Sequence, residues 1–179
     1  MRENYEPCGL SVTSERTLLV TARISDERGC ETGESRVVEY TSDGHVIRDI
    51  KLDRSIEYAW QTVQLSSDRL VVCHGLGSSL HRVCLINGEG QIIKSYGGEA
   101  GGGKGQLWGP YSLTTDNNSK LVFVADCDNH RVVMLDFDLT HLGQVHSPRD
   151  LKFPSRLYFD SSTDRLFVGE EHSRRVIRI

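Results

Sequence analysis

The sequence predicts an all-β fold built from a repeated unit of about 46 residues, and three observations support this prediction. The dipeptide Arg-Val recurs at positions 36, 82, 131 and 175, which are 46, 49 and 44 residues apart. Each unit contains several short runs rich in β-branched and aromatic residues, separated by polar turns. No segment keeps an apolar period of 3.6 residues, so we expect no long helix.

The repeat is clearest in the last two units. Residues 110–124 and 154–168 both read Pro-x-x-Leu-x-x-Asp, followed by a polar turn and a short β-rich run. The first two units follow the same order more loosely. There Pro7 to Leu10 and Trp60 to Val63 stand at the start, and the β-rich runs come before the Arg-Val pairs at 36 and 82.

A full unit contains four candidate strands. In the third unit they are residues 111–116, 120–125, 131–136 and 140–145. Turn residues at 42–44 and 87–90 mark the junction of third and fourth strands in the first two units. Four antiparallel strands in a repeat of this length are typical of a β-propeller blade. The chain is therefore expected to form one domain, residues 1–179, with blades at approximately 7–50, 59–96, 108–146 and 153–179.

The third unit resembles the NHL-repeat family. It has a Gly-rich approach at 97–107, then Pro110, then Val124-Ala125-Asp126 and Asn129-His130-Arg131-Val132. The resemblance is strong over 97–145, fair over 148–179, and weak but in register over 7–96. In the fourth unit residues 170–174 replace the Asp…Asn-His turn.

The resemblance implies a propeller, usually six-bladed, that lacks catalytic groups in most members. Its best-known animal representatives lie at the C-terminus of tripartite-motif proteins, behind a RING finger, and bind target proteins or single-stranded RNA. The RING confers ubiquitin ligase activity, and its cysteine and histidine pattern does not occur in this sequence. We therefore expect a binding platform that is not an enzyme, and any ligase activity would belong to a longer relative.

Six units of this length need about 276 residues. The 179 residues supply three full units and three strands of a fourth. Open blade edges and faces favour association with other chains. We expect either a piece of a longer protein or a partial ring that associates with itself.

Composition is that of an ordinary globular chain, and it favours a cytoplasmic location. The 21 basic and 25 acidic residues give a net charge of −4, without the basic excess typical of general nucleic-acid binding. The five cysteines include no Cys-x-x-Cys pair, which favours reduced thiols. The first residues have no apolar signal segment, and no apolar run is long enough to cross a membrane.

The sequence predicts no cofactor and no metal. Residues 98–105 match seven positions of a Walker A loop, but Gly105 replaces the Ser or Thr that holds magnesium. The seven histidines have no zinc-site spacing. We expect His74, His81, His130 and His172 to lie in loops on one face, where surface hydrogen bonding is favoured over a shared metal.

A buried or half-buried ion pair is expected between Asp126 and Arg131, which flank the tight loop of the third unit. Because an arginine recurs at the same place in each unit, we interpret these residues as structural. The structural set is Asp126, Arg36, Arg82, Arg131 and Arg175.

The candidate binding residues are aromatic, basic or amide side chains predicted on one propeller face. They are Arg54, Trp60, Lys104, Trp108, Tyr111, Asn129, His130, Arg149, Lys152 and Arg174. Acidic residues alternate with them, and this mixture fits a protein partner better than a phosphate backbone. Two alternatives stay open for function: single-stranded RNA on the same face, and an enzyme resembling propeller gluconolactonases or lyases. Packing between blades is an equal alternative for Trp60, Trp108 and Phe153.

Overall fold

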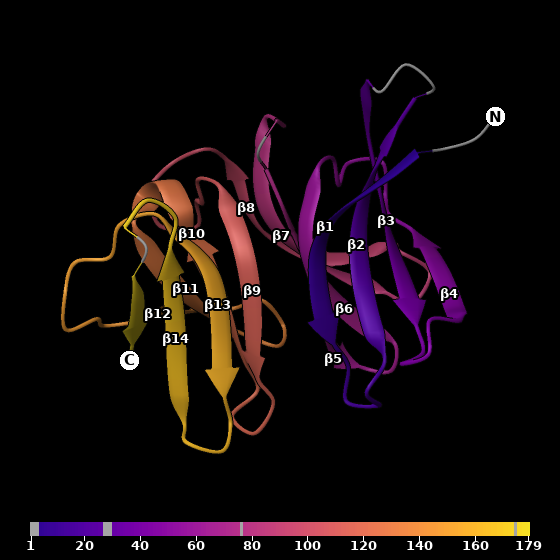
Figure 1. The fold of residues 1–179 in the computed structure, drawn as a ribbon. Helices are drawn as coiled ribbons and strands as arrows, with labels where there is room; N and C mark the ends of the chain where they lie inside the picture. The colour runs from indigo at the N-terminus through magenta and orange to yellow at the C-terminus, as the bar shows by residue number, and fades with distance from the viewer. Residues whose placement is uncertain (1–3, 27–29, 76, 174) are drawn as a thin grey trace.

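The structure is a computed structural model that describes residues 4–26, 30–75, 77–173 and 175–179. It consists of four antiparallel sheets, three with four strands and one with three. The strands of each sheet follow chain order, so that each sheet is one blade of a β-propeller. Figure 1 shows the sheets in an arc, with the indigo and yellow sheets at its two ends. The prediction of an all-β propeller is confirmed.

The strand bounds are as follows. Blade 1 contains β1 (Asn4–Val12), β2 (Leu18–Ser25), β3 (Glu31–Tyr40) and β4 (Val46–Lys51). Blade 2 contains β5 (Ala59–Ser66), β6 (Arg69–His74), β7 (Leu80–Asn87) and β8 (Ile92–Glu99). Blade 3 contains β9 (Pro110–Asp116), β10 (Leu121–Asp126), β11 (Arg131–Asp136) and β12 (His141–Gln144). Blade 4 contains β13 (Pro154–Asp160), β14 (Arg165–Glu170) and β15 (Val176–Arg178).

Helix is almost absent from the described residues, as the sequence predicts. The helical element is the 3-10 turn η1 (Cys127–Asn129), between β10 and β11. The four strands predicted for the third unit agree with β9 to β12 within about a residue at each end. The predicted turns contain Gly44 and Gly90, whose positive φ angles of 92° and 83° suit residues without a Cβ.

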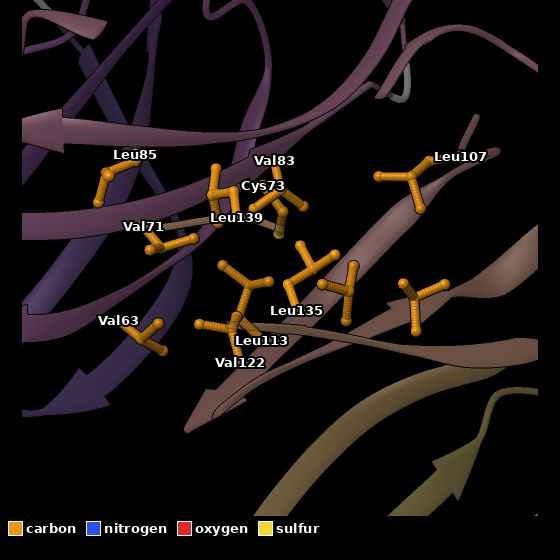
Figure 2. Packing of buried hydrophobic residues seen from close by; sticks show 12 residues of the cluster. Val63, Val71, Cys73, Val83, Leu85, Leu107, Leu113, Val122, Leu135 and Leu139 are labelled. Carbon is orange, nitrogen blue, oxygen red and sulfur yellow. The ribbon is translucent and has the colours of Figure 1, made fainter. Parts of the chain in front are cut away.

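Three apolar clusters lie between adjacent blades and hold the arc together. The first joins Leu19 and Val37 of blade 1 to Leu70 and Val72 of blade 2. Figure 2 shows the second, in which side chains of blade 2, such as Val71, point towards those of blade 3. The third includes Phe123 and Val132 of blade 3 with Leu157, Leu166 and Val168 of blade 4. Each blade is therefore stabilised mainly by its neighbours.

The inner strand of each blade lies against that of the next. A groove of about 380 Å³ runs along this inner side, lined by parts of β1, β5, β9 and β13. Hydrogen bonds cross between the inner strands: Ser11 Oγ donates to the carbonyl of Thr62 at 2.6 Å, and the Leu157 amide donates to Ser112 Oγ at 3.1 Å.

We predict that Gly9→Ala destabilises the contact between the first two blades. A Cβ at Gly9 would lie 2.2 Å from the Trp60 carbonyl oxygen and 2.8 Å from the Gln61 Cα, and both are backbone atoms that cannot turn aside. Overpacking of this kind lowers the free energy of unfolding by about 1–3 kcal/mol, and urea unfolding measures this loss. Gly98→Ala is the matched control, because its Cβ would have no atom within 4 Å. Equal stability of the two variants would contradict the prediction.

Candidate functional site: the loop face

We call the loop face the side of the propeller formed by two sets of loops. One set joins second to third strands within a blade, and the other joins the last strand of a blade to the first strand of the next. A network of hydrogen bonds on this face is centred on Asp126 at the end of β10, whose side chain has no exposed surface. Asp126 accepts hydrogen bonds from the Trp108 amide at 2.6 Å, Asn129 Nδ2 at 2.9 Å and Arg131 Nε at 2.7 Å.

These hydrogen bonds do not fully offset the burial of Asp126. Burial raises the pKa of the Asp126 carboxyl above its ordinary value, although the amide of Trp108, the side chain of Asn129 and the charge of Arg131 act in the opposite direction. Asp126 is thus a buried residue that connects two parts of blade 3. It binds the loop before β9 through the Trp108 amide, and it binds Arg131 at the start of β11.

Arg131 and Asn129 hold the Gly-rich loop in place. Arg131 Nη1 donates to the Gly102 carbonyl at 3.0 Å, and its Nη2 donates to the Gln106 carbonyl at 2.9 Å. Asn129 Nδ2 also donates to the Gly101 carbonyl at 2.8 Å. The loop therefore directs carbonyl oxygens at the guanidinium of Arg131. A phosphate-binding loop would instead direct its backbone amides at the ligand.

The recurring arginines occupy equivalent places but have different partners. Arg131 and Arg175 pair with the buried acids at the ends of β10 and β14, Asp126 at 2.7 Å and Glu170 at 3.4 Å. Arg36 instead pairs with Asp49 of β4 at 2.9 Å. Arg82 Nε donates to His74 Nε2 at 3.3 Å, and its Nη2 donates to the Ser55 carbonyl at 2.7 Å.

A recurring hydrogen bond connects each blade to the one before it. Tyr58, Gly109 and Phe153 stand just before β5, β9 and β13, each with a positive φ, of 53°, 65° and 49°. Their amides donate backwards, to the Gly33 carbonyl at 3.2 Å, to His81 Nδ1 at 3.0 Å and to His130 Nδ1 at 3.1 Å. The left-handed backbone directs each amide across the blade junction.

This contact fixes the tautomer of two histidines. Because Nδ1 of His81 and of His130 accepts a hydrogen bond, the proton of each neutral ring is on Nε2. Burial lowers the pKa of His81, and the charges of Asp128 and Asp126 partly oppose this effect. The sequence predicted loop positions and surface hydrogen bonds for both rings, but not that they bond to the next blade. His81 lies within β7 (Leu80–Asn87) and not in a loop.

His74 corrects the expectation that the loop histidines make surface hydrogen bonds. It is the last residue of β6 and is completely buried. It takes the place that Asp126 has in blade 3, opposite the recurring arginine. Burial, followed by the charge of Arg82, lowers the pKa of His74 to about 4. Among the described residues, no three His, Cys, Asp or Glu side chains gather as a metal site would require.

Trp60 and Tyr111 lie on inner strands and not on loops. Their rings are 4.2 Å apart, with Arg23 over Trp60 at 3.9 Å and Arg156 over Tyr111 at 5.4 Å. Each of the four blades supplies one member of this cation–aromatic row. Packing between blades is therefore what Trp60 and Tyr111 do in this structure. Arg23 and Arg156 could not be predicted from the sequence, because nothing in the repeat marks them.

Most of the remaining predicted residues are exposed on or next to the loops, whereas Asn129 is half-buried. Trp108 is 49% exposed, and its backbone is fixed at both ends: its amide donates to Asp126, and its carbonyl accepts from the Asp128 amide at 3.1 Å. A cleft of about 430 Å³ brings together Asn129, His130 and Arg149. Arg174 lies outside the described residues. The other exposed members of the predicted set are Arg54, Lys104 and Lys152.

Comparison with known proteins identifies the fold but no family. No family model and no curated protein matches the chain. Among solved structures, a catalytically inactive virginiamycin B lyase from Staphylococcus aureus matches 99% of the chain at 14% identity, with a TM-score of 0.60. A gluconolactonase from Xanthomonas campestris matches 94% at 17% identity and TM-score 0.62. The WD40 β-propeller domain of Doa1 matches 96% at 12% identity and TM-score 0.57.

The chain spans 58%, 55% and 62% of these three structures, respectively. At these identities the matches show the β-propeller fold alone. They nevertheless correct the prediction that the chain is not an enzyme. That prediction rested on the resemblance to NHL repeats, most of which lack catalytic groups, whereas the matched structures of the same fold include a lyase and a gluconolactonase. In the described part of the chain, no helix is long and apolar enough to cross a membrane.

Proposed function

We propose that the chain is an NHL-type propeller segment whose loop face binds a protein partner, with Trp108 as the central anchor. The observation that carries the proposal is the half-exposed indole of Trp108 on a backbone fixed by two hydrogen bonds. Aromatic side chains of this kind dominate the binding energy of protein interfaces. A rigid backbone lowers the entropy lost on binding. In a longer relative with a RING, this face would hold the protein to be ubiquitinated.

The charges around Trp108 support a protein partner over single-stranded RNA. Exposed basic side chains such as Lys104 and Lys152 are interleaved with exposed acidic side chains such as Glu57, Glu99 and Glu171. A phosphate backbone is attracted by basic side chains and repelled by acidic ones, whereas a protein surface can carry charges that match both signs. Two of the three tryptophan and tyrosine residues in the candidate set, Trp60 and Tyr111, already stack on each other and on arginines.

We predict that a photo-crosslinking amino acid at position 108 captures a discrete protein from a cell extract. Unlabelled wild-type chain should compete with this capture. Trp108→Ala should weaken the competition by about tenfold or more, as expected for a hot-spot aromatic. The matched control carries the same crosslinker at Ile93, an exposed apolar residue on β8, the outer strand of blade 2. Capture at 93 but not at 108 would contradict the proposal.

The RNA alternative is tested in the same experiment. We expect no measurable binding to a random pool of single-stranded RNA at physiological salt, and crosslinks that survive ribonuclease. If RNA is the ligand, binding should fall steeply with salt and disappear in the Lys104→Glu, Arg149→Glu double variant. Submicromolar RNA binding that falls with salt and disappears in the double variant would favour RNA over a protein as the ligand.

A further inference from the structure

The hydrogen bonds that cross the blade junctions on the loop face do not all have the same kind of acceptor. Between blades 1 and 2 the acceptor is the backbone carbonyl of Gly33. Between blades 2 and 3 it is Nδ1 of His81, and between blades 3 and 4 it is Nδ1 of His130. A carbonyl does not titrate near neutral pH, whereas an imidazole does. The two later junctions therefore depend on a group whose charge changes with pH.

Protonation of the acceptor nitrogen breaks such a hydrogen bond. The Gly109 amide donates to the lone pair of His81 Nδ1 at 3.0 Å, and the Phe153 amide donates to that of His130 at 3.1 Å. A proton that binds Nδ1 from solvent occupies this lone pair, so that both ring nitrogens carry a proton and neither accepts. His81 is half-buried and His130 is exposed, so protons from solvent can reach both rings.

The surroundings of His81 keep its hydrogen bond intact at neutral pH. Burial lowers the pKa of His81 below its ordinary value of 6.5, and the charges of Asp128 and Asp126 in blade 3 partly oppose this effect. In its own blade, His74 and Arg82 are the nearby charged or titratable residues among those described. Because the pKa of the folded state is lowered, the neutral ring is favoured above pH 6.5, and the junction weakens as the pH falls below this value.

The ring of His130 lies among groups of both signs. The charged or titratable side chains that line the same cleft of about 430 Å³ are Arg131, His146, Arg149 and Asp150. His130 also packs edge to face on Phe153, with 4.3 Å between the ring centroids, and His172 contacts the same phenyl ring. The Glu171 amide donates to the Phe153 carbonyl at 3.0 Å. Because His130 faces an open cleft, its ring can take up a proton without being buried as a cation.

We propose that protonation of His81 and His130 opens the loop face in mild acid. At neutral pH both hydrogen bonds are formed, and the loops of blades 2, 3 and 4 are joined. In mild acid both amides lose their acceptors, while the junction at the Gly33 carbonyl is unchanged. The apolar clusters between the blades do not titrate in this range, so the blades themselves stay together. The proposal does not depend on which ligand the loop face binds.

Opening at His81 acts on the turn that carries Trp108. Within blade 3, the Trp108 amide donates to Asp126 at 2.6 Å, and the Gly109 carbonyl accepts from the Cys127 amide at 3.1 Å. The hydrogen bond from Gly109 to His81 connects the same turn to blade 2. In mild acid this connection is lost, whereas the contacts within blade 3 remain.

The test is nuclear magnetic resonance of the isotopically labelled chain. At pH 7.5 we expect a coupling across the hydrogen bond between the Gly109 amide nitrogen and His81 Nδ1, and another between Phe153 and His130. Both couplings should disappear when the pH is lowered to about 5. After correction for the intrinsic rate at each pH, solvent exchange of the two amides should become at least about tenfold faster. The Tyr58 amide is the internal control, because its acceptor is a carbonyl and a general loss of stability accelerates all three amides alike.

Asparagine variants separate titration from structure. Asparagine places Oδ1 close to the position of histidine Nδ1, so that His81→Asn and His130→Asn keep an acceptor that does not titrate. Asparagine also tolerates the left-handed backbone of position 130, where φ is 55°. In the double variant, exchange of the Gly109 amide should depend on pH no more than that of Tyr58. The matched control is His45→Asn, an exposed histidine between β3 and β4, which should keep the wild-type pH dependence.

The wild-type measurements need no variant, and circular dichroism at each pH establishes that the chain is folded. Three results would each overturn the proposal. The first is the absence of both couplings at pH 7.5. The second is an equal response to acid at Gly109, Phe153 and Tyr58. The third is wild-type pH dependence in the asparagine double variant.

Discussion

Asp126→Ala is expected to destabilise the protein by about 3–5 kcal/mol, the cost of removing one member of a buried ion pair. The variant loses all three hydrogen bonds that the carboxylate accepts, from Trp108, Asn129 and Arg131. The Arg131 side chain is only 23% exposed, so its charge stays largely desolvated without a partner. The Trp108 amide also loses its acceptor. Urea unfolding measures the loss, and cleavage by protease should begin in the Gly-rich loop that Arg131 holds.

The matched control is Asp138→Ala. Asp138 pairs with Arg69 at the same distance of 2.7 Å, but the two side chains are 70% and 39% exposed. An exposed pair contributes about 1 kcal/mol or less, because water solvates both charges when the pair is broken. If the two variants lose equal stability, burial does not decide the strength of the Asp126 pair. Asp126→Asn keeps an acceptor for the Trp108 amide and should fall between them.

His74 should make the folded state sensitive to acid. Burial, followed by the charge of Arg82, lowers its pKa to about 4 from the ordinary value of 6.5. Below pH 6.5, His74 therefore takes up a proton in the unfolded chain but not in the folded chain. The free energy of unfolding falls as the pH is lowered, until the pH reaches about 4. The shift corresponds to a loss of about 3 kcal/mol across that window.

The measurement compares unfolding free energy between pH 7 and pH 4.5 for the wild type and His74→Gln. Glutamine keeps an oxygen that can accept from Arg82 Nε, so the variant should fold. Carboxylates titrate in both proteins and cancel in the comparison. The wild type should lose more stability than the variant as the pH falls. Identical pH dependence would show that His74 does not carry the effect.

The sequence by itself determined the blade. The Arg-Val spacing, the Pro-x-x-Leu-x-x-Asp pattern and the turn residues at 42–44 and 87–90 are local signals. They come from hydrogen bonding and side-chain alternation within a single sheet, so β9 to β12 could be placed almost to the residue. The partnership of Asp126 with Arg131 was also local, since the two residues face each other across one hairpin.

Only the tertiary structure decided what happens between blades. His74 and Asp126 take equivalent places opposite an arginine of their own blade. How deeply each side chain is buried, and which loop its arginine reaches, depends on packing between blades. Trp60 and Tyr111 were predicted on the binding face, but adjacent inner strands bring their rings together with Arg23 and Arg156. These contacts join residues roughly one repeat apart or more, and such pairings leave no periodic trace in the sequence. The repeat therefore predicts each blade, whereas packing between blades selects which side chains remain free to bind.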